Sequence, residues 1–96
     1  MQAYLSEGLS EGLGTFILCI VILANGDPIM IAVALLIGIL IANIASPAHL
    51  NPAVTLMKLL EGKVTNNEAM LLVGSQLAAA VLAVYWWNQV GNKKLV

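Results

Sequence analysis

The fold of this chain is decided by one stretch, Ser46-Pro47-Ala48-His49-Leu50-Asn51-Pro52-Ala53-Val54-Thr55-Leu56. It lies between two strongly apolar segments, residues 29–45 and 69–87. Asn51 is a favoured N-cap residue, and Pro52 suits the first position of a helix, where its missing N–H leaves no donor unpaired. The stretch therefore predicts a short helix that begins at Pro52 in apolar surroundings.

The residues before this short helix are expected to form irregular backbone with free carbonyl groups. At membrane depth such backbone is tolerated only where it lines a water-filled cavity. The side-chain amide of Asn51 carries N–H donors that can face the same cavity and a solute within it. The pattern indicates a re-entrant loop, from Ser46 to Leu50, beside a pore.

Composition supports a membrane protein independently of this motif. The 96 residues are 60% hydrophobic and 9% charged, with a mean hydropathy of +0.94, outside the range of ordinary soluble domains. This length allows about three spans of about 20 residues each. Four basic residues and a net charge of −1 give no basis for nucleic-acid binding. No step of solute passage requires bond chemistry, a metal or a cofactor, so we expect neither an enzyme nor a cofactor site.

Turn and cap signals divide the chain into helices within a single membrane domain, residues 1–96. Asn25-Gly26-Asp27-Pro28 predicts a tight turn, and Thr65 to Glu68 offers an N-cap with an acidic first turn. The expected segments are helix one at about 4–24, helix two at about 28–45, the re-entrant loop and half-helix at about 46–60, helix three at about 66–88, and a tail at 89–96 with Lys93 and Lys94.

Small residues recur at four-residue spacing on each expected long helix. In lipid, such ridges allow helix backbones to approach closely and hold a bundle together. The ridges are Gly8 with Gly12; Ala34, Gly38 and Ala42; and Ser75, Ala79 and Ala83.

The stretch around Asn51 resembles the first Asn-Pro-Ala loop of the aquaporin and aquaglyceroporin (major intrinsic protein) family. The family form reads Ser-Gly-Ala-His-Leu/Phe-Asn-Pro-Ala-Val-Thr, and Pro47 here replaces its glycine. Glu11-Gly-Leu-Gly-Thr-Phe16 resembles the Glu-Phe-x-Gly-Thr of the family's first helix, and Gln76 with Ala79-Ala80 resembles its third-helix Gln-x-x-Gly-Ala. Family members carry two such repeats, and this chain carries one.

The resemblance implies an all-α membrane protein with three transmembrane helices and one re-entrant half-helix, one half of the family's inverted repeat. It implies a multi-pass, integral membrane channel for water or small neutral solutes such as glycerol. The implied channel motif is Asn51, Pro52 and Ala53. The implied pore-lining carbonyls belong to Pro47, Ala48, His49 and Leu50. Glu11 and Gln76 would support the loop.

The expected constriction of the pore is aliphatic. In the family, the outer filter uses an arginine directly after the second Asn-Pro-Ala, but this chain contains no arginine, and Val54 follows its motif. Helix two offers Ile31 and Leu35 at the facing positions. We therefore expect a wider, more permissive constriction, with exclusion of cations resting on helix dipoles.

A single repeat can reproduce the family's pore only if copies assemble, and inverted-repeat logic requires two antiparallel copies. Loop lysines set membrane orientation. Lys58 and Lys63 lie on the side of the N-terminus, and Lys93 and Lys94 lie on the other, so no strong bias fixes one orientation. We expect a homo-oligomer in the lipid bilayer with an antiparallel dimer as the pore unit, and eight chains by analogy with the family's four pores.

Two alternatives remain open at this point. Glu11 is an intramembrane carboxylate, so the chain could be a small dual-topology, proton-coupled transporter. It could also be a half-channel that needs a separate partner subunit.

Overall fold

The computed structural model describes the backbone of residues 2–90 and the side chains of residues 4–90. The tail residues Lys93 and Lys94 lie outside the described part. Within that part the chain is all-helical, and its elements are α1 (Gln2–Ala24), α2 (Pro28–Ala42), α3 (Pro52–Leu60) and α4 (Asn66–Gln89).

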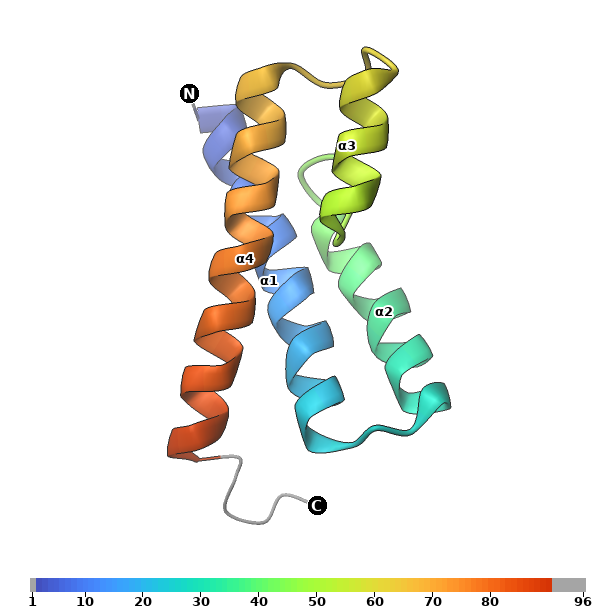
Figure 1. Cartoon of the computed structure of the whole chain (residues 1–96), viewed down its shortest axis with the longest axis vertical. Coiled ribbons are helices and arrows are strands. Elements are labelled where there is room, and N and C mark those ends of the chain that lie inside the picture. Colours follow the sequence, from blue (N-terminus) through green and yellow to red (C-terminus); the bar gives the residue numbers. More distant parts are fainter. Residues whose placement is uncertain (1, 91–96) are drawn as a thin grey trace.

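The helices lie along a common long axis, and the chain measures 43 Å in that direction. α1 packs against both α2 and α4, and α3 packs against α4. In Figure 1, α1 and α4 each run the full height of the bundle, whereas α2 covers the lower half and α3 the upper half. The two short helices therefore share one side of the bundle, with residues 43–51 joining them at mid-height.

Two helices are long and apolar enough to cross a membrane, α4 and the Tyr4–Ala24 part of α1. α2 has 15 residues, which at about 1.5 Å per residue gives about 22 Å, less than the roughly 30 Å hydrocarbon core. The prediction that helix two reaches residue 45 is wrong, because this helix ends at Ala42.

Asn43 explains the early end of α2. Its Oδ1 accepts a hydrogen bond from the Ala48 N–H at 2.7 Å. Asn side chains that bind nearby backbone in this way compete with helix continuation. The bond also closes the first part of the loop into a compact turn, which brings the chain back towards mid-height.

Local capping fixes where the other helices begin and end. Thr65 and Glu68 form a reciprocal capping box, so α4 begins at Asn66. α3 ends at Leu60, and Gly62 follows in a left-handed conformation with φ 74°. A glycine at this place is a common helix stop, because it adopts positive φ without a Cβ clash. The chain then turns towards α4.

The predicted small-residue ridges lie at helix contacts. On α2, Ala34, Gly38 and Ala42 are its buried residues. Gly38 faces Gly14 of α1 so closely that a Cβ added to Gly38 would lie 2.8 Å from the Gly14 carbonyl oxygen. Only glycine permits this approach, so the pair sets the distance between α1 and α2.

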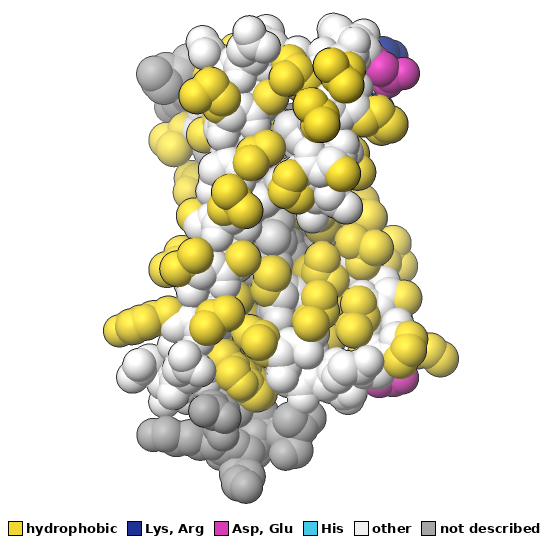
Figure 2. Space-filling model, viewed as in Figure 1, with side chains coloured by type: hydrophobic (Ala, Val, Ile, Leu, Met, Phe, Trp, Pro, Cys, Tyr) yellow, Lys and Arg dark blue, Asp and Glu magenta, His cyan; other side chains and the backbone are white. Residues whose placement is uncertain are grey.

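Large apolar side chains cover the outside of the bundle. They include Leu9, Leu36, Leu40, Val81 and Leu82, each more than half exposed. Figure 2 shows apolar side chains along the whole face, with charged side chains only near its two ends. In water such a surface would be costly, whereas lipid or a second chain accommodates it.

Candidate pore loop

The Asn51-Pro52 turn forms as the sequence predicts. Asn51 is the N-cap of α3, with extended backbone (φ −158°, ψ 123°), and its Oδ1 accepts a hydrogen bond from the Ala53 N–H at 2.8 Å. Pro52 occupies the first helical position. Because the cap uses the side-chain oxygen, the Nδ2 amino group of Asn51 stays available for another partner.

Leu50, directly before this turn, has a left-handed backbone with φ 54°. This conformation is uncommon for a residue with a Cβ and costs on the order of 1 kcal/mol. Its side chain is buried at the point where Gly14 and Gly38 meet. The close approach of α1 and α2 therefore shapes the pocket that receives the loop.

Glu11 of α1 binds the side of the loop that faces α1, which we call the rear of the loop. Its Oε1 accepts the His49 N–H at 3.1 Å, and its Oε2 accepts both the Leu50 N–H and the Gln76 Nε2 group, the latter at 2.8 Å. Glu11 is only 2% exposed. A carboxylate that accepts backbone N–H groups forms strong, charge-assisted hydrogen bonds. Glu11 thus offsets the strain at Leu50 and anchors the loop to α1.

Thr55 completes this cluster from α3. Its hydroxyl lies 2.8 Å from His49 Nδ1 and accepts the Gln76 Nε2 group at 3.1 Å. Thr55 is completely buried, and Gln76 is 3% exposed. We call Glu11, His49, Thr55 and Gln76 the loop cluster, because together they join α1, α4 and α3 to the loop.

Sequence reasoning missed Thr55 as a member of this cluster and Asn43 as a loop tie. For each residue, a feature of the sequence could have indicated its role. Thr55 follows Asn51 by four positions, so on a helix it lies one turn after the cap. Asn43 is the one polar side chain in the apolar run 29–45.

The front of the loop has a different character. Asn51, Pro52 and Ala53 are all exposed. Within the described residues, no hydrogen bond ends on a carbonyl oxygen between Pro47 and Leu50. The carbonyl oxygens of residues 47–50 and the Asn51 Nδ2 group thus have no hydrogen-bond partner among the described residues, whereas the Ala53 N–H at the start of α3 is capped by Asn51.

Comparison with protein families matches the chain to the major intrinsic protein family over residues 2–94. The match covers nearly the whole chain. The chain belongs to the major intrinsic protein family. Comparisons with curated proteins and with solved structures give no match. Membership implies an integral membrane channel for water or small solutes, and the all-helical fold agrees with one half of the family's architecture.

The expected constriction residues of this major intrinsic protein come from two helices. Val54 on α3 and Ile31 on α2 are half-buried, and Leu35 on α2 is 39% exposed. Their role in a constriction stays a prediction.

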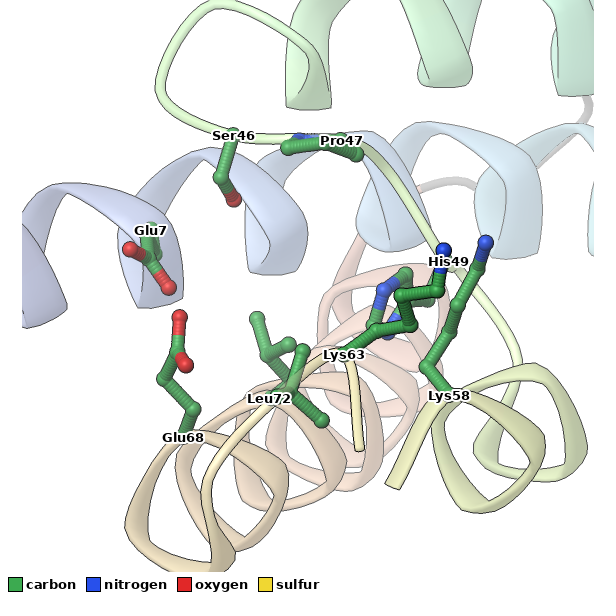
Figure 3. A pocket seen from close by; sticks show the side chains of 9 residues that line it. Glu7, Ser46, Pro47, His49, Lys58, Lys63, Glu68 and Leu72 are labelled. Atoms are coloured by element: carbon green, nitrogen blue, oxygen red, sulfur yellow. The ribbon is translucent and has the colours of Figure 1, made fainter. Parts of the chain in front are cut away.

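A cavity of about 260 Å³ lies between the loop, α1, α3 and α4. One wall carries Glu7 of α1 and Glu68 of α4, whose carboxyl groups point towards each other in Figure 3. The other wall carries His49, Lys58 and Lys63 (Figure 3). The cavity therefore presents acceptors on one side and donors on the other.

Proposed function

We propose that this major intrinsic protein is a passive channel for water and small neutral solutes such as glycerol, with a pore completed by a second, antiparallel copy. One observation carries the proposal. The backbone N–H groups of His49 and Leu50 bind Glu11, whereas the Asn51-Pro52-Ala53 turn is exposed, and the Asn51 Nδ2 group and the carbonyl oxygens of residues 47–50 have no hydrogen-bond partner among the described residues. Backbone of this kind at membrane depth is tolerated where it lines a water-filled passage.

The front of the loop offers the groups that a dehydrating solute needs. The carbonyl oxygens of Pro47, Ala48, His49 and Leu50 would accept hydrogen bonds from water or a polyol, and Asn51 would donate one. The N-terminus of α3 carries about half a positive charge, which opposes the entry of cations. Selectivity in such pores follows from diameter, lining donors and acceptors, and electrostatic barriers.

The proposed permeant range follows from the aliphatic constriction. Val54, Ile31 and Leu35 carry neither donors nor a fixed cation. A passage bounded by these side chains would discriminate by size more than by hydrogen bonding. We therefore expect glycerol, urea or ammonia to pass as well as water.

The open surfaces support assembly of two copies. Asn51 and its neighbours are exposed on one face, and the apolar exterior also requires a partner or lipid. An antiparallel copy would bring a second α3 N-terminus towards the first at the midplane. In each copy α1 and α4 would then cross the membrane, and the shorter α2 and α3 would together cover its thickness, with several pores per larger assembly.

The two alternatives differ in how well the geometry supports them. Proton-coupled transport would need access to Glu11, but this carboxylate is 2% exposed and accepts hydrogen bonds from three partners. That placement favours a supporting role. A half-channel with a different partner subunit would use the same open face, and co-purification of a second membrane protein would support it.

Stopped-flow osmotic measurements on proteoliposomes that contain only this chain test the channel. We expect fast water and glycerol flux in the parent, and altered flux in Asn51→Asp, which retains an N-cap but replaces the amide donor. Flux equal to that of empty liposomes, with folded protein inserted, would contradict a self-sufficient channel. Water flux without glycerol flux would contradict the permissive constriction.

Single-cysteine cross-linking tests the antiparallel arrangement. In a Cys19→Ala background, Ala53→Cys places a thiol on the exposed motif, and Lys63→Cys places one near the membrane surface. Antiparallel copies would cross-link at position 53, whereas their two thiols at position 63 would lie on opposite sides of the membrane. Cross-linking at position 63 would indicate parallel copies.

A further inference from the structure

Three consecutive backbone N–H groups of the loop are bound by side-chain oxygens. Glu11 accepts those of His49 and Leu50, and Asn43 Oδ1 accepts that of Ala48 at 2.7 Å. A trans peptide unit is planar, so its N–H and C=O groups point in opposite directions. No peptide bond in the described part of the chain is cis. Each bound N–H therefore also fixes the direction of the carbonyl group in the same peptide unit.

The Asn43 bond fixes the peptide unit that joins Pro47 to Ala48. Because the Ala48 N–H points to Asn43 at the end of α2, the Pro47 carbonyl group points away from Asn43. Pro47 is exposed, and no described residue donates a hydrogen bond to its carbonyl oxygen. At membrane depth an unpaired carbonyl group is tolerated where it meets water or a solute, and not where it meets lipid. The direction that Asn43 imposes therefore suits a carbonyl group that lines a passage.

Pro47 restricts the same peptide unit from its other side. The proline ring holds φ near −65°, and proline has no N–H by which the preceding peptide unit could be bound. With φ fixed by the ring, the direction of the Pro47 carbonyl group depends on ψ alone. The bond from the Ala48 N–H to Asn43 fixes this remaining angle. An acceptor held in this way need not be ordered when a solute arrives, which lowers the cost of binding.

We propose that Asn43 is a positioning residue of the passage, which acts through the Ala48 N–H to direct the Pro47 carbonyl group towards the solute as a pre-ordered hydrogen-bond acceptor. The inference rests on the proposed channel function and adds a residue at the end of α2 to it. The solute contact is made by the Pro47 carbonyl oxygen. Asn43 thus directs one carbonyl group of the loop, and Glu11 directs the two that follow.

The chain contains an internal control for this peptide unit. It has two Pro-Ala pairs, Pro47-Ala48 and Pro52-Ala53. In both pairs an asparagine Oδ1 accepts the alanine N–H, at 2.7 Å and 2.8 Å respectively. The Pro52 carbonyl group lies in the first turn of α3, where helix geometry pairs it with the N–H of Leu56. The two pairs therefore share one kind of N–H bond and differ in what the carbonyl group can meet.

Solid-state NMR in lipid bilayers tests the proposal, with proline labelled with ¹³C at the carbonyl carbon and alanine labelled with ¹⁵N. Only the two Pro-Ala pairs give a one-bond ¹³C–¹⁵N correlation in such a sample. Glycerol is the solute probe, and sucrose at matched osmolality is the bulky control. We expect glycerol to shift the Pro47 carbonyl resonance in a saturable manner and to leave that of Pro52 unchanged. A Pro47 resonance that does not respond to glycerol would overturn the proposal in the parent chain alone.

Variants at position 43 connect this response to the Asn43 side chain. Asn43→Asp keeps an oxygen that accepts the Ala48 N–H, Asn43→Ala removes it, and Ile44→Ala is the matched control at an exposed neighbour. We expect the glycerol response of Pro47 to fall about twofold or more in Asn43→Ala only, together with a shift of the Ala48 ¹⁵N resonance. The Pro52-Ala53 correlation should stay in place in all three. An undiminished Pro47 response in Asn43→Ala would overturn the positioning role.

Permeability gives a second readout of the same acceptor. We expect the ratio of glycerol to water permeability to fall about twofold to tenfold in Asn43→Ala and to stay near the parent value in Asn43→Asp and Ile44→Ala. Equal ratios in Asn43→Ala and the parent would overturn the contribution of Asn43 to selectivity. The NMR response needs no flux. A Pro47 response without flux would therefore support the solute contact while contradicting the channel function.

Discussion

The two sides of the loop around Asn51 differ in how fully their polar groups are bonded. Behind the loop, the backbone N–H groups of His49 and Leu50 bind a buried carboxylate, which in turn is held by Gln76. In front, the motif residues are exposed and the carbonyl oxygens have no described donor. The same few residues therefore have hydrogen-bonded N–H groups on one side and carbonyl oxygens without a described donor on the other.

This difference explains how irregular backbone can persist at membrane depth. The rear contacts hold the chain in a conformation that includes a strained Leu50, and they involve none of the groups to which the proposed function assigns solute contacts. A pore loop bonded on both sides would have nothing to offer a permeant. One bonded on neither side would not keep its shape.

Substitution of Glu11, which binds the backbone N–H groups of His49 and Leu50, should lower the free energy of unfolding the most. In Glu11→Gln, the amide presents N–H groups to donors, so at least one buried N–H of the loop loses its acceptor. We expect a loss of about 3 to 5 kcal/mol in the free energy of unfolding in detergent. Glu61→Gln, at an exposed glutamate, is the matched control and should change stability by less than about 0.5 kcal/mol. Similar stability of the two variants would mean that Glu11 does not anchor the loop.

Separating α1 from α2 should have the next largest effect. A Cβ at Gly14 would overlap the carbonyl oxygen of Gly38, so Gly14→Ala must push the helices apart and widen the pocket for Leu50. We expect a loss of about 1 to 3 kcal/mol in the free energy of unfolding. Gly74→Ala, where an added Cβ meets nothing within 4 Å, should instead be neutral or stabilising by up to about 1 kcal/mol. Thermal unfolding of both variants distinguishes these outcomes, and equal losses would contradict the special role of Gly14.

Changes on the open side should have the smallest effect on stability. Asn51→Ala removes the cap of α3 and should lower the free energy of unfolding by about 1 kcal/mol, whereas Asn51→Asp keeps a capping oxygen and should change it little. Both variants should still alter flux, because both lose the amide donor. If Asn51→Ala lowered the free energy of unfolding as much as Glu11→Gln, the front of the loop would contribute as much to stability as the rear.

Local signals in the sequence predicted much of this fold. The Asn51-Pro52 pair marked the start of α3, and Thr65 with Glu68 marked the start of α4. Each of these is an interaction between residues within four positions, so the sequence displays it directly. The small residues of α2 were also identified in advance, because helical periodicity places Ala34, Gly38 and Ala42 on one face.

The contacts between distant residues were less accessible. Family resemblance suggested that Glu11 and Gln76 support the loop, but no pattern in one sequence shows that Thr55 lies between Gln76 and His49. The end of α2 was predicted three residues late, because the tie from Asn43 to Ala48 depends on the path of the loop and not on helix propensity.

The position of Glu11 in the chain has a consequence for biogenesis. Its partners His49 and Leu50 emerge 38 and 39 residues after it, and Gln76 emerges 65 residues after it. While α1 is in the bilayer alone, this carboxylate therefore has none of the partners that later surround it. The loop can bind Glu11 only after residues 49 and 50 have emerged, and Gln76 of α4 joins this carboxylate later still.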